Sequence, residues 1–159
     1  MKTSNIHLGE DVFINPASSV NNVIIGNRVK IAKYCSIYGS ENNLLEIGDE
    51  TYIGMFSIVN GFAAKVTIGH HVSIAQNVNI MADSGPNASP IMQQYFPVVT
   101  GPVTIGNHSW IGAGAILMPG VELGEFCVVA ANSYVNKSFP AYSVIGGNPA
   151  KLIKRIEVE

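Results

Sequence analysis

The chain has little charge, few cysteines and no long apolar run. Only 13% of its 159 residues are Asp, Glu, Lys or Arg, and its formal net charge is −2. Nucleic-acid binding requires a basic footprint, so we do not expect nucleic acid as the main partner. No apolar stretch approaches the ~20 residues of a membrane-spanning helix, and the first residues lack a signal-peptide pattern. The composition therefore predicts a cytoplasmic protein without a membrane span.

The cysteine count and the chain length limit the architecture further. Two cysteines in 159 residues cannot form a disulfide framework. The length suits a single domain, residues 1–159, with a core of its own. Sixteen glycines and many β-branched residues, with few helix formers in series, argue against a helical protein.

Aliphatic residues recur every six positions through most of the chain. The first residue of each hexad is almost always aliphatic, the second is often glycine, and the fifth is small or β-branched. Both cysteines, Cys35 and Cys127, fall on the fifth position, where we expect buried side chains. The clearest hexads are IGNRVK, IAKYCS, IGDETY, IGMFSI, IGHHVS, IAQNVN, IMADSG, IGNHSW, IGAGAI, LMPGVE, LGEFCV, VAANSY and VNKSFP.

A six-residue period does not fit one face of an α-helix, because six steps of 100° leave an offset of 240°. A short strand followed by a turn fits it, with the first and fifth side chains on one side. Three such strands form one triangular coil, and successive coils stack about 4.8 Å apart as parallel ladders. The pattern predicts an all-β, single-stranded parallel β-helix.

The six-residue repeat is interrupted between residues 84 and 103, where GPNASPIMQQYFPVVTGP contains proline, glycine and four large apolar residues. A long loop on a rigid scaffold usually serves a site. We expect it to border a substrate pocket, with a clamp between subunits, formed by Tyr95 and Phe96, as the alternative.

The C-terminal segment, about 141–159, is expected to cap the open end of the solenoid. Pro149 suits a first helical turn, and AKLIKRI then predicts a short amphipathic helix whose Leu152, Ile153 and Ile156 cover the core. Four of the nine basic residues lie between positions 137 and 155: Lys137, Lys151, Lys154 and Arg155.

Two stretches, WIGAGAILMPGVELG from Trp110 and GGNPAKLIKRI from Gly146, resemble the galactoside and maltose O-acetyltransferases and the polysaccharide O-acetyltransferases of the hexapeptide-repeat acyltransferase superfamily. The resemblance implies a left-handed β-helix and a homotrimer with acetyl-CoA lying in the groove between subunits. It places coenzyme contacts at Ala113, Ala131, Asn136, Lys137, Lys151 and Lys154, and the neighbouring Arg155 completes a cationic cluster suited to phosphates. Trp110 is open to coenzyme contact or to trimer packing.

In that family a histidine at the start of the loop is the general base, but here those positions are Asp83, Ser84, Gly85 and Pro86. Asp83 could accept the proton or orient the acceptor instead. Stacking the hexads in register gives a ladder of Arg28, Glu50, His71 and His108 at the fourth position. His108 lies in the first coil after the loop, beside the loop's exit, so we take Asp83, His108 and His71 as catalytic candidates, with a solvated ladder as the alternative for His71.

The acceptor stays open at this stage. The resemblance favours O-acetylation of a saccharide, in a surface polysaccharide or a sugar precursor. The missing histidine favours N-acetylation of an amino sugar, perhaps one linked to a nucleotide, because an amine needs less base assistance than a hydroxyl. A zinc protein of the γ-carbonic-anhydrase type is a third alternative, although no third histidine ligand is evident beside His71 and His108 and we expect no metal.

Overall fold

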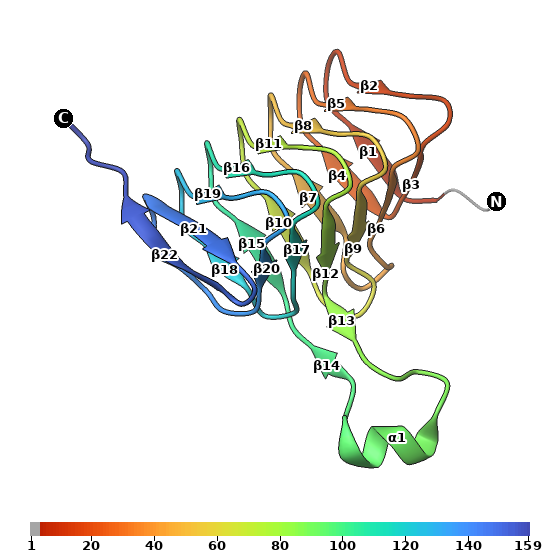
Figure 1. Cartoon of the computed structure of the whole chain (residues 1–159). Helices are drawn as coiled ribbons and strands as arrows, with labels where there is room; N and C mark the ends of the chain where they lie inside the picture. The colour runs from red at the N-terminus through yellow and green to blue at the C-terminus, as the bar shows by residue number, and fades with distance from the viewer. Residues whose placement is uncertain (1–3) are drawn as a thin grey trace.

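The computed structural model describes residues 4–159 and shows a left-handed parallel β-helix built as a triangular prism (Figure 1). Each face of the prism is one parallel sheet. The first sheet contains β1 (Ile6–Leu8), β4 (Val23–Ile25), β7 (Leu45–Ile47), β10 (Val66–Ile68), β15 (Val103–Ile105) and β18 (Glu122–Leu123). The third contains β3 (Ser19–Asn21), β6 (Ser36–Tyr38), β9 (Ile58–Asn60), β12 (Asn79–Met81), β17 (Ile116–Leu117) and β20 (Tyr134–Val135).

The second sheet lies between these two in each coil and has two additional strands at its C-terminal end. Its strands are β2 (Phe13–Ile14), β5 (Lys30–Ile31), β8 (Tyr52–Ile53), β11 (Ser73–Ile74), β16 (Trp110–Ile111), β19 (Val128–Val129), β21 (Ser143–Gly147) and β22 (Ala150–Arg155).

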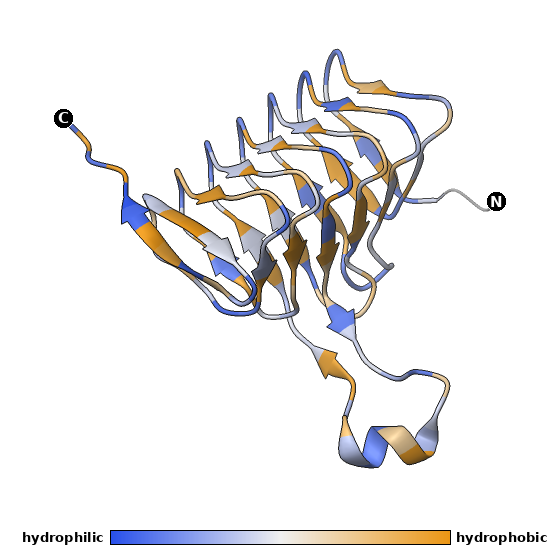
Figure 2. Cartoon of the chain, in the orientation of Figure 1, coloured by the Kyte–Doolittle hydropathy of each residue, from blue (hydrophilic) through white to orange (hydrophobic). Residues whose placement is uncertain are grey.

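The hexad pattern sets the core as predicted. The register aligns the first hexad position of each coil with that of the next, as in Ile25↔Ile47 and Ile68↔Ile105. These side chains and those at the fifth position form one buried cluster that runs through the coils. Figure 2 shows apolar residues recurring in the strands and hydrophilic residues at the turns.

Small polar residues at the fifth position make hydrogen bonds inside the core. The Thr51 hydroxyl donates to the carbonyl oxygen of Gly69 at 2.8 Å, and that of Ser57 donates to Ala75 at 3.1 Å. The two cysteines, buried as expected, occupy the same position and direct their thiols at carbonyl oxygens of neighbouring turns. These contacts satisfy polar groups that burial would otherwise leave unpaired.

The prism has three edges, where the chain turns from one sheet to the next. We call the edge between the first and second sheets the histidine edge: residues 10–11, 27–28, 49–50, 70–71, 107–108, 125–126 and 141–142. The acid-free edge, between the second and third sheets, comprises residues 16–17, 33–34, 55–56, 76–77, 113–114 and 131–132. The loop edge joins the third sheet to the first sheet of the next coil.

Most turns on the first two edges place a residue in the left-handed region of φ, for example His71 at 55° and Phe56 at 61°. Side chains with a Cβ rarely adopt this conformation. It recurs here because the backbone of each turn donates a hydrogen bond to the preceding coil, as in His108 N–H to the His70 carbonyl at 2.9 Å.

The predicted loop leaves the loop edge as a hairpin. Strand β13 (Asp83–Ser84) pairs antiparallel with β14 (Val99–Thr100), and α1 (Pro90–Tyr95) lies at the tip, away from the prism (Figure 1). The Ser89 hydroxyl caps α1 by accepting from the Met92 N–H at 3.1 Å. No residue of α1 is buried, and Tyr95 and Phe96 are 72% and 67% exposed.

The predicted C-terminal helix is wrong. Residues 150–155 form β22, which pairs antiparallel with β21, and Pro149 lies in the turn between them. Leu152 and Ile153, expected to cover the core, are exposed, and Ile156 is only half-buried; Phe139, Ile145 and Ala150 are the buried apolar residues at this end. The physical reason is the free edge of β21: a hairpin satisfies its backbone groups, whereas a detached helix would leave them unpaired.

Candidate active site

Asp83 lies at the base of the protruding loop, where β13 leaves the prism. Its backbone pairs with Thr100, and its side chain is half-buried. The Asn60 side-chain amide donates a hydrogen bond to the Asp83 carboxylate at 2.8 Å. This contact fixes one carboxylate oxygen and leaves the other free to accept a proton or to bind a substrate amine or hydroxyl.

Tyr38 stands next to Asn60 in the third sheet, one coil further from the loop. Burial raises the pKa of the Tyr38 phenol, and the negative charge of Asp83 raises this pKa further. The phenol therefore stays protonated at neutral pH and is available as a hydrogen-bond donor. Neither Asn60 nor Tyr38 was predicted from the sequence. Each is the last residue of a strand in the third sheet, and both stack in register with the last residue of β12, two positions before Asp83.

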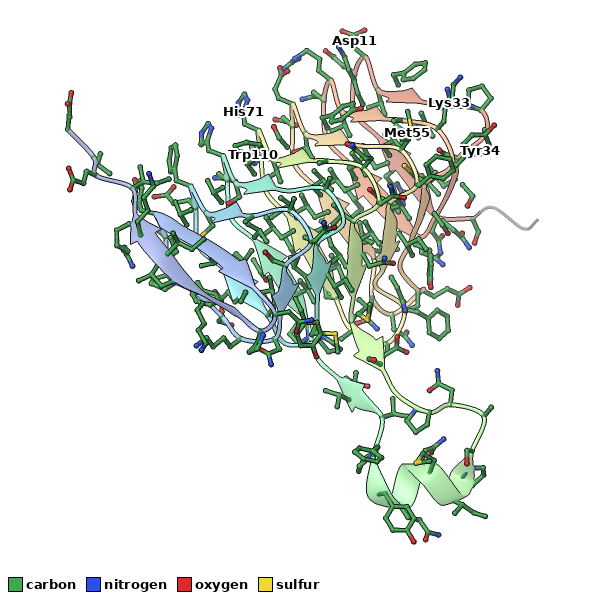
Figure 3. All side chains as sticks on the ribbon, in the orientation of Figure 1. Asp11, Lys33, Tyr34, Met55, His71 and Trp110 are labelled. Atoms are coloured by element: carbon green, nitrogen blue, oxygen red, sulfur yellow. The ribbon has the colours of Figure 1, made fainter. Side chains whose placement is uncertain are left out.

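His71 and His108 stack on the histidine edge, as the ladder predicted. Their ring centroids are 5.0 Å apart with an interplanar angle of 4°. The stack continues from His108 to Phe126 at 4.7 Å and from Phe126 to Tyr142 at 5.2 Å. On the N-terminal side, Glu50 and Arg28 form an ion pair. Figure 3 shows His71 pointing outward from a turn of the prism.

The three catalytic candidates do not meet within one chain. Asp83 lies on the loop edge, on one side of the first sheet. His71 and His108 lie on the histidine edge, on the other side of that sheet. The histidine pair would reach Asp83 only from a neighbouring subunit.

The coenzyme candidates separate into three groups. Ala113 and Ala131 stack on the acid-free edge, joined by the Asn132 N–H to Ala113 carbonyl bond at 2.8 Å. Gly114, beside them, has φ of +72° and no side chain, which keeps this part of the edge flat. A pantetheine arm could approach the backbone closely here.

The second group, Asn136 and Lys137, is exposed on the loop edge, where the Lys137 ammonium lies 5.4 Å from the centroid of the Phe139 ring. The third group, Lys151, Lys154 and Arg155, is exposed on β22. All three lie within six residues at the C-terminal end, in a strand whose pairing shifts register between Val144 and Ile145.

No group of three His, Cys, Asp or Glu side chains within residues 4–159 has the arrangement of a metal site. In the same part of the chain, no helix is long and apolar enough to cross a membrane.

Comparison with known proteins identifies the family. Residues 102–137 match the model of the bacterial transferase hexapeptide family (six repeats). The chain is 34% identical over 155 residues to dTDP-4-amino-4,6-dideoxy-D-glucose acyltransferase of Escherichia coli, covering 92% of this chain and 80% of the relative. It is 33% identical over 121 residues to galactoside O-acetyltransferase of E. coli K12, covering 76% of this chain and 58% of that relative.

Among solved structures, AntD, an N-acyltransferase from Bacillus cereus in complex with dTDP and 3-hydroxybutyryl-CoA, superposes with a TM-score of 0.82 and 28% identity, over 94% of this chain and 82% of AntD. The chain spans about 60% of the length of other relatives, such as a putative acetyltransferase of Saccharomyces cerevisiae. The prism, the protruding loop and the near full-length similarity to a sugar acyltransferase lead to one conclusion: the chain belongs to the hexapeptide-repeat acyltransferase family.

Proposed function

We propose that the protein transfers an acetyl group from acetyl-CoA to a saccharide, with a sugar amine as the favoured acceptor. The observation that carries this proposal is the base of the loop, where Asp83, held by Asn60, occupies the position at which a histidine was expected. The relative matched over most of both chains acts on a nucleotide-linked amino sugar, and AntD is an N-acyltransferase. Both similarities support the amine.

The chemistry suits a carboxylate. A sugar ammonium binds to the negative Asp83 and gives one proton to the carboxylate, and the neutral nitrogen attacks the thioester carbonyl carbon to form the carbon–nitrogen bond. The tetrahedral intermediate collapses, the carbon–sulfur bond breaks, and the leaving thiolate of coenzyme A takes up the second proton that the nitrogen releases. A hydroxyl acceptor would demand more of the same carboxylate, because an alcohol must be deprotonated as it attacks.

We propose that the coenzyme lies along the C-terminal coils. Ala113 and Ala131 would admit the pantetheine arm, Asn136 and Lys137 would hydrogen-bond to it or to a phosphate, and Lys151, Lys154 and Arg155 would meet the phosphates. These groups lie on different edges of one prism, so the arrangement calls for a neighbouring subunit. The exposed Tyr95 and Phe96 would pack there, and we propose a homotrimer with sites between subunits.

A hydroxyl acceptor is the second candidate, favoured by the similarity to galactoside O-acetyltransferase. Release of free thiol from acetyl-CoA distinguishes the two. We expect thiol release with amino sugars, with a rate that rises as the pH approaches the pKa of the amine. Faster release with the matching hydroxyl sugars would assign O-acetylation, and no release with either class would refute the proposed function.

A further inference from the structure

Two turns of the loop edge next to Asp83 enclose a hollow on the surface. They follow β6 and β9 and lie on the N-terminal side of the protruding loop (Figure 1). The hollow has a volume of about 340 Å³, near the lower end of the range of roughly 300–1,000 Å³ found for small-molecule sites. Its lining residues are Asn22, Ser40, Glu41, Asn42 and Phe62.

The first of these turns is a tight hairpin. Ser40 and Asn43 exchange backbone hydrogen bonds of 2.9 and 3.1 Å, so Glu41 and Asn42 occupy the tip. The Asn43 side-chain amide donates to the carbonyl oxygen of Phe62 at 3.2 Å, which ties the hairpin to the second turn. The walls of the hollow are therefore connected to each other by hydrogen bonds.

The same series of hydrogen bonds continues to Asp83. The Phe62 N–H donates to the side-chain oxygen of Asn60 at 3.0 Å, and the Asn60 amide nitrogen donates to the Asp83 carboxylate at 2.8 Å. Both ends of the Asn60 side chain are thus engaged, which fixes the orientation of its amide. The hollow and the Asp83 carboxylate are positioned relative to each other within one chain.

The hollow combines polar groups with one aromatic ring. Asn22 is only 8% exposed, and its side-chain oxygen accepts a hydrogen bond from the Asn5 amide at 2.8 Å. Its Nδ2 donates to no acceptor among residues 4–159, although Asn22 lines the hollow. A largely buried donor of this kind gains free energy from a ligand oxygen. Phe62, by contrast, is 61% exposed and offers an apolar surface.

The charge around the hollow restricts the class of ligand. Glu41 is exposed at the hairpin tip and forms no ion pair within residues 4–159, and Asp83 lies on the same edge. Carboxylates repel phosphate groups and attract an ammonium group. Amide and hydroxyl side chains suit the hydroxyl groups of a ligand, and an aromatic ring suits an apolar ring face. A saccharide ring that is uncharged or carries an amine has all of these properties.

We infer that the hollow binds a second sugar ring, glycosidically linked to the one whose amine reacts at Asp83. The linked ring lies against Phe62, with its hydroxyl groups at Asn22 and Ser40. The acceptor is then a glycoside of at least two rings without phosphate on the linked ring. This inference rests on the proposed function, because it extends the acceptor site at Asp83 by one subsite.

The experiment compares glucosamine with its β-1,4-linked dimer as acceptors for the full chain, by thiol release from acetyl-CoA. We expect kcat/KM to be at least about tenfold higher for the dimer, since a filled apolar and polar subsite discriminates by about this factor. Phe62→Ala should lower kcat/KM for the dimer to about that of glucosamine, while its backbone keeps the hydrogen bonds with Asn43 and Asn60. Glu41→Gln should reduce the preference for the dimer and its dependence on salt.

Phe56→Ala is the matched control, because Phe56 is 51% exposed on the acid-free edge, away from the hollow. This variant should keep the preference for the dimer. Binding without transfer is followed by proton NMR of the dimer in the absence of acetyl-CoA. Ring protons of the linked sugar should shift upfield with the unchanged protein and not with Phe62→Ala, because an aromatic ring shields protons that lie over its face.

The inference is overturned if kcat/KM is equal for the two acceptors, or if the preference for the dimer survives Phe62→Ala. An equal loss with both acceptors in Phe62→Ala also overturns it, since Phe62 would then act on Asp83 through Asn60. So does the absence of an upfield shift at millimolar dimer. Thiol release without a preference for the dimer would refute only the second subsite. A Phe62-dependent shift without thiol release would refute only the transfer activity.

Discussion

The histidine edge and the acid-free edge have the same backbone and opposite chemistry. Both stack left-handed turns coil upon coil, and both form aromatic columns. The histidine edge, however, also carries charge, in the Arg28–Glu50 pair on the N-terminal side of its rings and in a contact of 3.6 Å between the His70 imidazole and the Asp49 carboxylate. The acid-free edge has no carboxylate and only lysine as a charged residue.

The two edges differ because the hexad repeat constrains the inward positions and does not constrain the outer turn positions. Side chains there contribute little to the core, so charge and shape along an edge can follow a ligand. On the histidine edge the polar groups are used by the fold itself: the Asp49 carboxylate accepts the Asn27 N–H at 2.7 Å, and the Asn107 side-chain oxygen accepts the His70 N–H at 2.8 Å. We therefore propose a structural role for the polar groups of the histidine edge, whereas the acid-free edge carries the coenzyme candidates Ala113 and Ala131.

The largest expected effect comes from Asp83→Asn, which keeps the hydrogen bond from Asn60 but removes the carboxylate. Loss of a general base should lower kcat/KM by ~10²–10⁴-fold, with an unchanged unfolding midpoint. The matched control is Asp49→Asn on the histidine edge, where an amide oxygen replaces the carboxylate as acceptor, as Asn27 and Asn107 already show. Equal losses in both variants would contradict the assignment of chemistry to Asp83.

Removing cations from β22 should give the next largest effect. Lys151→Ala/Lys154→Ala is expected to weaken acetyl-CoA binding by about tenfold or more, and to make it less dependent on salt, because each lysine would contact a phosphate. Calorimetric titration measures both. Lys65→Ala is the control, since Lys65 pairs with Glu46 at 2.6 Å on the first sheet. Unaltered binding in the double variant would leave β22 as an end cap only.

A smaller effect is expected from His108→Ala, which interrupts the column between His71 and Phe126. Aromatic pairs contribute about 0.5–1.5 kcal/mol, so the free energy of unfolding should fall by about 1 kcal/mol. Turnover should stay within about twofold, because one chain keeps His108 apart from Asp83. If turnover fell as far as in Asp83→Asn, the catalytic role predicted for His108 from the sequence would stand, with the histidine supplied across a subunit groove.

The smallest effect concerns the two buried cysteines, one behind each edge. Burial raises the pKa of the Cys35 and Cys127 thiols. The unfolded chain ionises first as pH rises, so the stability that these thiols contribute is fully present below about pH 9 and is lost as pH rises through their folded pKa. Cys35→Ser/Cys127→Ser should unfold within about 1 kcal/mol of the unchanged protein at pH 7, because serine already fills this position in Ser57 and Ser109.

Denaturant unfolding at pH 7 and pH 10 measures this difference. The double serine variant should lose less stability between the two pH values than the cysteine protein. A fall of the same size in both would show that other groups dominate the alkaline range.

The sequence alone predicted the coil, because a six-residue period with buried first and fifth positions allows few alternatives to stacked strands. It also located the loop at residues 84–103 and the ladder that pairs His71 with His108, since both follow from counting hexads. The resemblance of two motifs added the handedness and the coenzyme. The C-terminal helix was mispredicted because a seven-residue pattern of apolar and basic residues fits helix or strand equally well.

The C-terminal strand and the neighbours of Asp83 depend on tertiary contacts, which a count of hexads does not contain. The free edge of β21 selected a strand for residues 150–155, since pairing an exposed edge is a non-local interaction. The stacking of third-sheet strands brought Asn60 to Asp83 and Tyr38 beside it, from 23 and 45 positions away along the chain. The three-sided winding put Asp83 and the histidines on different edges. A period fixes which side chains face inward, but the partners of an outward side chain depend on the neighbouring coils.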